Sequence, residues 1–540
     1  MAKLYQYIMI SVLINSVFFL IYGFKLISDG QDFSHFGYPN ALGSSDLTGV
    51  IRMSQIYKDS GFLEFFTKYT NYPEGENVFT FYLFSQLSTN LLIHVFNFAS
   101  PKSVVLIIQF IFSSITTLCI LITLNLAIKK LVYSSLLAAT CLIIPFNIVN
   151  LQAHINGLLW GLPLLAVSTY YAKYSGYKTR KWYLPFLFVI SIVTDIYLCY
   201  ALVFIILTQK LFELYYLIKP TNFFGQKLNK IVSYLNFKNG IYYKVLWCAV
   251  GFSLLLILST NKVVYFIESI YEGSVFEPGR VQGLFLLDLS LLNVFLVSSA
   301  VYFFFILKKL TDADKWLFWV AASFLALSIN IGTFKGHNIS PAKILSPLLV
   351  NLDHTQRFIP YSVIIYFILY LKLLSKISIK RFHLIRFRQS YFYTIFLSVY
   401  ILRLLYLGGT EHVSDHSLRY EKFRNAVPTD MAILMIPQTV LDRDWIQQAY
   451  INRPIVNSLV SSLKNNEIDR ISVSAPILIR QYMQSNGTQF LAMPCKNKII
   501  WKNDKSGYLD FDKEFSLESV VTDRGYENGP FKVCLFKTAK

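Results

Sequence analysis

Charged residues are scarce in this chain. Only 15% of its 540 residues are Asp, Glu, Lys or Arg, whereas soluble proteins average about 25%. In their place, 54% of the residues are hydrophobic and 16% are aromatic, and the mean hydropathy is +0.46. This composition argues against an ordinary soluble protein and predicts one that lies largely in lipid.

Signatures of several soluble enzyme classes are also missing. The sequence holds no C-x-x-C pair, no H-E-x-x-H, no Walker-type loop and no G-x-G-x-x-G after a predicted strand. Metal–thiolate, zinc-protease, ATPase and dinucleotide-binding functions therefore lack support. No period of about 20–50 residues repeats, which argues against a solenoid.

Cysteine is rare, and its positions carry little information. Four of the six cysteines lie in apolar runs, where we expect them to be small hydrophobic residues: Cys119, Cys141, Cys199 and Cys248. Cys495 and Cys534 lie in the more polar C-terminal part, where an oxidising compartment would allow a disulfide. The sequence leaves open whether that disulfide forms.

What the chain has in abundance is long apolar runs. Runs of about 17–25 residues can cross a bilayer core of about 30 Å, and in lipid they must be helical because every backbone polar group needs a partner. The first run is too long for a cleavable signal peptide and lacks a small-residue cleavage site. The predicted membrane helices are 4–27, 103–128, 131–149, 157–172, 183–195, 198–218, 244–260, 284–307, 316–330, 358–374 and 391–407.

The positions of the basic residues give the expected orientation. The chain has a net charge of +19, and many of its Lys and Arg residues cluster in alternate short loops, at 129–130, 173–181, 219–244, 308–315 and 372–388. This positive-inside pattern indicates a cytoplasmic N-terminus rather than a nucleic-acid partner. One more apolar run, 79–98, would invert every later loop if it crossed the membrane. We interpret it as a re-entrant or interfacial segment, with a spanning helix as the alternative.

The predicted fold is a polytopic α-helical membrane protein with about eleven transmembrane helices and a small C-terminal α/β domain. Residues 1–407 form the membrane domain, in which 28–102 is a large first outer loop that contains the 79–98 segment. Residues 408–540 have mixed charge and no run long enough to span, which predicts a soluble extracytoplasmic domain. Within it we expect strands at 431–436 and 531–536 and helices at 444–450 and 476–484.

Polar groups gather in the loops that this topology places on the outer face. Ionisable residues at such depths are functional candidates, because the membrane makes them costly to keep. Each also has a plainer explanation, as a solvated loop charge, an interfacial residue or a side chain that snorkels to the interface. The candidates are Asp46, Glu74, Glu76, His154, Asn156, Asp195, Tyr197, Arg280 and Arg357.

Short motifs surround several of these candidates. They are the Asp-bearing first loop with NYPEG at 71–75, HINGLLWGLPL at 154–164, TDIY at 194–197 and an R-F pair at 357–358. The tail adds ILMIP at 433–437 and NRPIVN at 452–457. In layout and in these stretches the chain resembles the bacterial membrane glycosyltransferases of the GT-C fold, which take a sugar from a polyprenyl-phosphate carrier. The order of helices and loops is similar over nearly the whole chain, but the amino-acid identities agree only in these short motifs.

For catalysis, the resemblance implies that Asp46 is the general base that takes the proton of the acceptor hydroxyl, and that the sugar is transferred with inversion. His154 and Asp195 would orient the sugar or that acid, or hold a divalent cation such as Mg²⁺ or Mn²⁺ near Asp46. Relatives that bind a metal often carry a carboxylate in the second outer loop, where this chain has His154 and Asn156. No cofactor is therefore certain, and the metal question stays open.

For binding, the resemblance implies that Arg357 and Arg280 hold the phosphate of the departing lipid, because a guanidinium can bind phosphate through two hydrogen bonds. The other substrate-binding candidates are Glu74, Asn156 and Tyr197. The implied partners are a polyprenyl-phosphate sugar donor, a glycan or glycolipid acceptor and the lipid bilayer of a bacterial inner membrane. The sequence does not name the sugar or the acceptor, nor does it say whether the product is part of lipopolysaccharide.

Two other classes of protein stay open. A transporter or flippase of lipid-linked saccharides would show internal pseudo-repeats and polar residues near the bilayer midplane, and we find neither in the sequence. A non-catalytic membrane subunit would show no dependence on Asp46. An assay of sugar transfer distinguishes both from a glycosyltransferase.

Overall fold

Two compact units make up the chain. Unit 1 comprises Met1–Tyr22, Phe110–Asn150 and Asn156–Leu407, and unit 2 comprises Gly23–Gln109, Leu151–Ile155 and Gly408–Lys540. The structure is a computed structural model, and it describes residues 2–28, 54–58, 61–62, 66–67, 76–77, 83–96, 101–142, 155–177, 183–218, 284–285, 291–330, 332–334, 337–339, 355–376, 422–436, 452–456, 476–496, 511–525 and 529–538.

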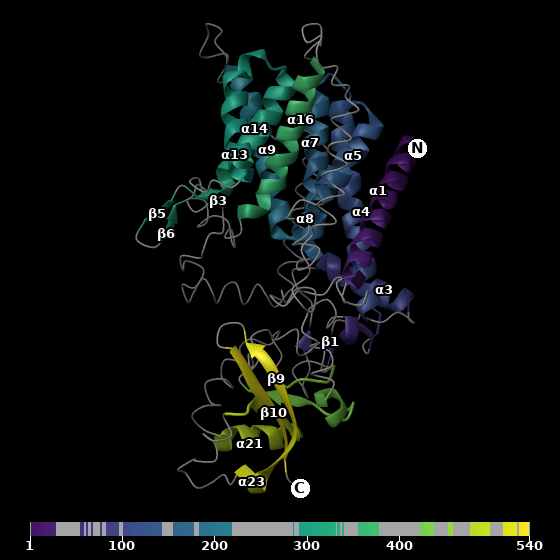
Figure 1. The fold of residues 1–540 in the computed structure, drawn as a ribbon, viewed down its shortest axis with the longest axis vertical. Coiled ribbons are helices and arrows are strands. Elements are labelled where there is room, and N and C mark those ends of the chain that lie inside the picture. The colour runs from purple at the N-terminus through teal and green to yellow at the C-terminus, as the bar shows by residue number, and fades with distance from the viewer. Residues whose placement is uncertain are drawn as a thin grey trace, which may run out of the picture. The chain divides into compact units, whose positions relative to one another are not determined.

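Apolar helices build unit 1 (Figure 1). They are α1 (Ala2–Ser28), α4 (Pro101–Ile128), α5 (Leu131–Leu142), α7 (Leu162–Tyr174), α8 (Leu184–Thr194), α9 (Ile196–Ile218), α13 (Leu291–Phe305), α14 (Asp312–Ser328) and α16 (Ile359–Lys376). Among the described residues, three helical stretches are long and apolar enough to cross a membrane: Lys3–Ile21, Ser103–Ile128 and Ile196–Leu214. The predicted spans 244–260 and 391–407 lie outside the described residues, and each of the others coincides with one of these helices.

The fourth predicted helix is interrupted near its start. Residues 157–172 were expected as one helix, but a 3-10 turn, η2 (Ile155–Leu159), comes first and α7 begins only at Leu162. Pro163 occupies the first turn of α7, a position that suits proline because the backbone N–H groups there have no partner within the helix. The prediction was wrong at this boundary because hydropathy alone does not register a proline start.

Two later helices also begin at residues other than those predicted. The predicted start at 316 is too late for α14, because Thr311 caps the helix by accepting the Asp314 N–H at 3.3 Å. The predicted start at 284 is too early for α13, because Leu284–Phe285 forms a short strand, β3, that pairs in parallel with β4 (Ile329–Asn330). Polar capping residues and strand pairing therefore set boundaries that the apolar runs do not.

The segment 79–98 holds a single short helix, α3 (Leu83–Val95), in the part that the structure describes. Its 13 residues extend about 20 Å at 1.5 Å per residue, which is less than a bilayer core of about 30 Å. Because α5, α7 and α8 are as short, the placement of α3 in the membrane, whether re-entrant, interfacial or spanning, stays a prediction.

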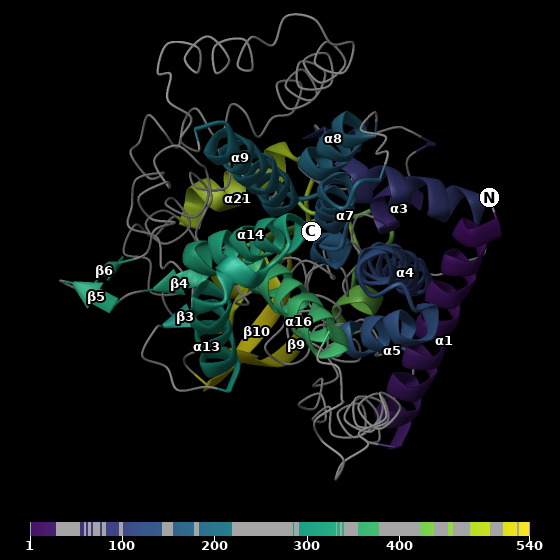
Figure 2. The same ribbon diagram turned by 90° about the horizontal axis from the view of Figure 1, so that it is seen from above.

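The helices of unit 1 are joined by polar as well as apolar contacts. Asn15 in α1 donates from Nδ2 to Thr117 Oγ1 at 2.9 Å and accepts from Ser113 Oγ at 2.6 Å, and both partners lie in α4. Such hydrogen bonds fix the pairing of helices where lipid supplies no hydrophobic drive between them. Elsewhere α14 packs against α16, α9 and α7 (Figure 2). The helices that follow the motifs at 154–164, 194–197 and 357–358 therefore lie together.

Gly161 permits a close approach between the start of α7 and α4. Its N–H donates to Thr116 Oγ1 at 3.2 Å, and the Thr116 hydroxyl in turn donates to the Leu158 carbonyl. A Cβ added at Gly161 would lie 2.8 Å from the Thr116 carbonyl oxygen and 2.9 Å from its Cα. Because the obstacle is backbone, no side-chain rotation relieves it.

We expect Gly161→Ala to destabilise the protein by about 1–3 kcal/mol, the usual cost of overpacking a close-packed contact. Thermal unfolding of the detergent-solubilised protein, followed by intrinsic fluorescence, checks this as a lower Tm. Gly161→Ser should lower Tm at least as much, since it adds a larger group at the same point. An unchanged Tm in both variants would show that α4 and α7 do not approach this closely.

A four-stranded sheet organises the C-terminal part of unit 2. Its strand order is β7 (Ile433–Met435), β8 (Phe490–Pro494), β10 (Gly529–Thr538) and β9 (Phe515–Gly525). β7 pairs with β8 in parallel, whereas β8, β10 and β9 pair antiparallel. The strand predicted at 431–436, that at 531–536 and the helix at 476–484 are found as β7, β10 and α21 (Pro476–Ser485), while 444–450 lies outside the described residues.

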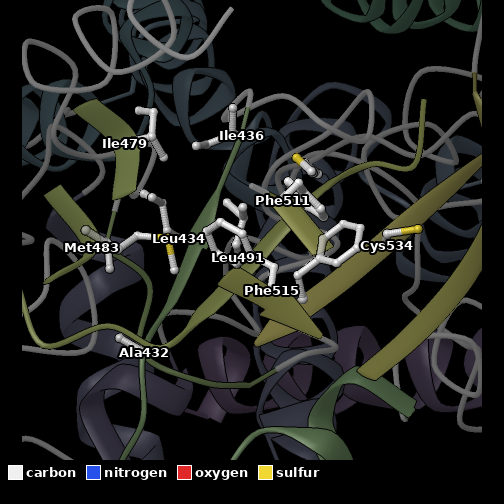
Figure 3. Close-up of a cluster of buried hydrophobic side chains, with 12 residues drawn as sticks. Ala432, Leu434, Ile436, Ile479, Met483, Leu491, Phe511, Phe515 and Cys534 are labelled. Atoms are coloured by element: carbon white, nitrogen blue, oxygen red, sulfur yellow. The ribbon is translucent and has the colours of Figure 1, made fainter. Parts of the chain in front are cut away.

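Hydrophobic side chains cover both faces of this sheet. On one face Leu434 and Leu491 pack with Ile479 and Met483 of α21 and with Phe511 of α23 (Phe511–Glu514), as Figure 3 shows. The opposite face carries Ile433, Met435, Phe490, Leu535 and, from the helical turn at 422–426, Phe423. The alternation along β7 follows from the period of two in a strand, which sends successive side chains to opposite faces.

A disulfide and several short elements complete the described chain. Cys495 and Cys534, whose pairing the sequence left open, are joined by a disulfide. β1 (Phe66–Thr67) pairs with β2 (Glu76–Asn77), and β5 (Gly332–Phe334) pairs with β6 (His337–Ile339). Two 3-10 turns, η5 (Leu307–Lys309) and η6 (Thr355–Phe358), precede α14 and α16.

Candidate functional site

Asp195 occupies the break between α8 and α9. Its backbone is extended, with φ −157° and ψ 130°, so it ends α8 and starts α9. Its Oδ1 accepts the Tyr197 N–H at 2.9 Å, and its carbonyl oxygen accepts the Leu198 N–H at 3.0 Å. Asp is favoured at such a cap because its carboxylate satisfies a backbone N–H at the helix start. One carboxylate oxygen is thus engaged by the chain itself.

Arg357 engages the other oxygen of this carboxylate. It lies in η6, just before α16, and its Nη1 donates to Asp195 Oδ2 at 3.0 Å. The Asp195 side chain is 7% exposed and the Arg357 side chain 20% exposed. An ion pair this buried is less screened than a surface pair, so loss of either partner leaves an uncompensated charge. The two residues are 162 positions apart in sequence.

Tyr197 and Phe358 hold the arginine in place. The Arg357 guanidinium carbon lies 4.5 Å from the centroid of the Tyr197 ring, a cation–π contact. The neighbouring Phe358 is buried, and its ring lies 6.0 Å from that of Tyr197, 5.9 Å from Phe204 and 5.8 Å from Phe324. Phe358 therefore anchors η6 against α9 and α14, which limits where Arg357 can point.

Aromatic packing continues from this pair towards η2. Tyr361, one turn into α16, stacks on Phe324 with 4.8 Å between ring centroids and meets the edge of Trp160 at 6.0 Å. Trp160 follows η2 directly, so the motif at 154–164 is joined to α16 through these rings. Trp160 stands in a motif recognised in the sequence, but Tyr361 and Phe324 could not be singled out there, because aromatic residues in an apolar helix give no signal of their partners.

The guanidinium retains donors that Asp195 does not use. Arginine carries five N–H donors in a planar fork, and Asp195 takes one of them among the residues that the structure describes. A partly buried cation with donors to spare suits an anion whose oxygens can accept two parallel hydrogen bonds, such as a phosphate or carboxylate. The carboxylate of Asp195 orients the fork rather than saturating it.

The structure brings together three of the predicted site residues: Asp195, Arg357 and Tyr197. Asn156 lies at the start of η2, and its buried Oδ1 has no hydrogen-bond partner in the described part of the chain. A buried amide oxygen without a donor is costly, which makes it a candidate to accept a hydrogen bond from a ligand. Of the remaining candidates, Glu76 lies in the short strand β2, and Asp46, Glu74, His154 and Arg280 lie outside the described residues.

Asp195 does not fit a metal site as the structure has it. Both carboxylate oxygens accept hydrogen bonds, and one of the donors is a cation that would repel a second cation. Within the described ranges no group of three His, Cys, Asp or Glu side chains could hold a metal ion. A divalent cation held by His154 and Asp46 stays a prediction, since neither residue is described.

Two further ion pairs, which the sequence analysis did not single out, lie at the other ends of the same helices. Lys372 in α16 pairs with Asp314 in α14, and Lys173 in α7 pairs with Glu213 in α9. Glu213, an acid within the predicted membrane helix 198–218, was the available signal, because such a residue needs a partner inside the bundle. These pairs join α16 to α14 and α7 to α9 at the end remote from Asp195.

Comparison with known proteins finds similar structures but no similar sequences. No protein-family profile matches the chain, and no curated protein matches it in sequence. ArnT from Cupriavidus metallidurans, solved bound to undecaprenyl phosphate, has 10% identity and a TM-score of 0.48, with 97% of each chain covered. The Archaeoglobus fulgidus oligosaccharyltransferase in its apo form has 12% identity and a TM-score of 0.49, with 98% of this chain and 74% of that chain covered.

This chain is similar in structure to GT-C fold membrane glycosyltransferases. That is the kind of protein which the motifs also resemble.

Proposed function

We propose that this protein is a membrane glycosyltransferase. It moves a sugar from a polyprenyl-phosphate carrier to a glycan or glycolipid acceptor of the bacterial cell envelope, on the outer face of the inner membrane. One observation carries the proposal. Arg357 is a partly buried cation, held by Asp195 and stacked on Tyr197 at the membrane-helix ends, and the described residues leave N–H donors of its guanidinium for a phosphate.

The reaction that fits this cation is displacement at the anomeric carbon. The acceptor hydroxyl oxygen attacks that carbon, the bond from the carbon to the phosphate oxygen breaks, and the lipid phosphate leaves with the bonding electron pair. The hydroxyl proton passes to a carboxylate, for which Asp46 is the proposed base on the grounds of sequence. Negative charge grows on the phosphate as it leaves, and a preorganised guanidinium stabilises it most at that moment. Attack from the opposite face gives inversion.

Five other candidates have a proposed place in this scheme. Asp195 positions Arg357, since both its oxygens are engaged, and Asn156 offers its buried Oδ1 to a sugar hydroxyl. Arg280 is proposed as a second phosphate-binding cation, on the resemblance alone. His154 and Glu74 are proposed to orient the sugar or the base on the same grounds. The C-terminal domain, residues 408–540, is proposed to lie on the outer side of the membrane.

Sugar transfer by the purified protein tests the proposal. We would incubate it with a panel of polyprenyl-phosphate sugars and envelope-lipid acceptors, and follow label from donor to acceptor. In parallel, liposomes with fluorescent lipid-linked saccharide would report movement between leaflets. Transfer supports the proposed function. Movement between leaflets without transfer would favour a flippase, and neither activity across the panel would favour a non-catalytic subunit.

A further inference from the structure

Lysines and tyrosines gather around the turn between α4 and α5. Lys129 and Lys130 form this turn, and the Lys130 Nζ lies 5.2 Å from the centroid of the Tyr133 ring. The Lys129 Nζ lies 5.6 Å from the ring of Tyr177, which follows the end of α7. The turn is remote from Arg357, because α4 runs for 12 more residues, or about 18 Å, from its contact with Gly161 to Ile128.

The backbone holds these side chains in place. Lys129 has a φ of +59°, a left-handed conformation that costs a residue other than glycine about 1 kcal/mol or more. At the end of α7, Gly176 has a φ of +81°, and the Tyr177 N–H donates to the Ala172 carbonyl at 3.0 Å. This is a Schellman ending, which turns the chain back over the helix and sets Tyr177 beside Lys129.

Three other lysines near this end of the bundle have carboxylate partners, whereas Lys129 has none among the described residues. Lys173, Lys315 and Lys372 pair with Glu213, Asp312 and Asp314. Lys129 is exposed and has no carboxylate partner among the described residues. A cation fixed over an aromatic ring and left without an acid is complementary to an anion from outside the chain.

The surroundings of the turn point to an anion that belongs to the bilayer. Val132, two residues after Lys130, is 67% exposed, so an apolar side chain faces outward directly beside the lysines. Tyrosines with an apolar body and a polar tip are enriched at the level of lipid headgroups. Acyl chains can cover Val132 while a headgroup phosphate meets the lysines. A soluble anion would bring nothing to cover that apolar surface.

We infer that Lys129 and Lys130, with Tyr133 and Tyr177, bind the phosphate headgroup of an anionic phospholipid in the leaflet at this end of the helices. Each lysine near a membrane surface contributes about a fivefold gain in affinity for anionic lipid, so the two together contribute about thirtyfold. The inference is independent of the proposed sugar transfer, which takes place at the other end of the helices.

The chain offers a control matched in charge and in place. Lys308 and Lys309 lie in η5 before α14, at the same end of the bundle, and both are exposed. Among the described residues, neither has an acidic partner or an aromatic ring beneath it. Lys308→Gln/Lys309→Gln therefore removes the same two charges from the same face without touching the proposed lipid site. Lys129→Arg/Lys130→Arg keeps the charges where they are.

Binding of phosphatidylglycerol by the full-length protein tests the inference. Detergent-solubilised wild type and variants would be titrated with phosphatidylglycerol, and with phosphatidylcholine as the reference lipid. Native mass spectrometry would report the bound lipid, and thermal unfolding would report the change in Tm. We expect phosphatidylglycerol to stay bound and to raise Tm in three proteins: wild type, Lys129→Arg/Lys130→Arg and the control Lys308→Gln/Lys309→Gln. Lys129→Gln/Lys130→Gln should bind it about thirtyfold more weakly. Equal binding by this variant, or an equal loss in the control, would overturn the site.

Discussion

Arg357→Gln is expected to lower kcat/KM for sugar transfer by about 10²–10³-fold, the usual cost of removing one preorganised donor from a growing charge. Because the donor phosphate is anionic before the reaction, part of the loss should be a higher KM for the donor lipid. Because the charge grows as the bond breaks, the rest should be a lower kcat. Steady-state kinetics at varied donor concentration separates the two contributions.

Two further variants separate a loss of catalysis from a loss of stability. Arg357→Lys retains the charge but loses the planar fork, so we expect it to lose less activity than Arg357→Gln. Arg357→Gln alone leaves the buried Asp195 carboxylate without its cation, which by itself destabilises the fold. The double variant Asp195→Asn/Arg357→Gln removes both charges and should recover much of the lost Tm. If Arg357→Gln transfers sugar as wild type does, Arg357 is not at the site.

Asp195→Asn tests whether this acid acts through Arg357 or on the substrate. Asn can still accept the Tyr197 N–H, so the start of α9 should survive while the arginine loses its ionic partner. If Asp195 only positions Arg357, its substitution should lower kcat/KM in wild type and have little further effect in Arg357→Gln. Independent losses that multiply in the double variant would instead place Asp195 against the substrate.

The fold was predictable where length and hydropathy decide it. In the described part of the chain, the apolar runs predicted as membrane helices contain helices, and Asp195, an acid between two such runs, separates α8 from α9. The boundaries were wrong where side chains decide them. Thr311 and Asp314 start α14 well before its apolar run, and a closer reading of capping residues would have found this start.

The site was predictable only as a set of candidates. Topology placed Asp195, Tyr197 and Arg357 on the same face, but nothing in the sequence relates residue 195 to residue 357. Their pairing depends on how α9 and α16 pack around α14, and that packing is decided by rings such as Phe358 and Phe324. Such packing leaves only an apolar pattern in the sequence, shared by every helix of the bundle.

Asp46→Ala and Asp46→Asn are expected to lower kcat for sugar transfer by about 10²–10⁴-fold, the usual contribution of a general base. The acid acts on the proton of the acceptor during the reaction, so the KM for the donor lipid should change little. This pattern differs from that expected for Arg357→Gln, in which the donor KM rises. Asp46 itself lies outside the described residues, and its assignment rests on the resemblance of the first loop.

Asp32→Asn provides the matched control for Asp46, because it neutralises another acid of the same loop. Full activity in Asp32→Asn together with loss in both Asp46 variants, at unchanged Tm, would assign the base. Wild-type rates in Asp46→Asn would move the base to another acid. Asp195 is a poor substitute, because Tyr197 and Arg357 already engage its two oxygens. Glu74 would then be the next acid to test, since it lies in the same outer loop as Asp46.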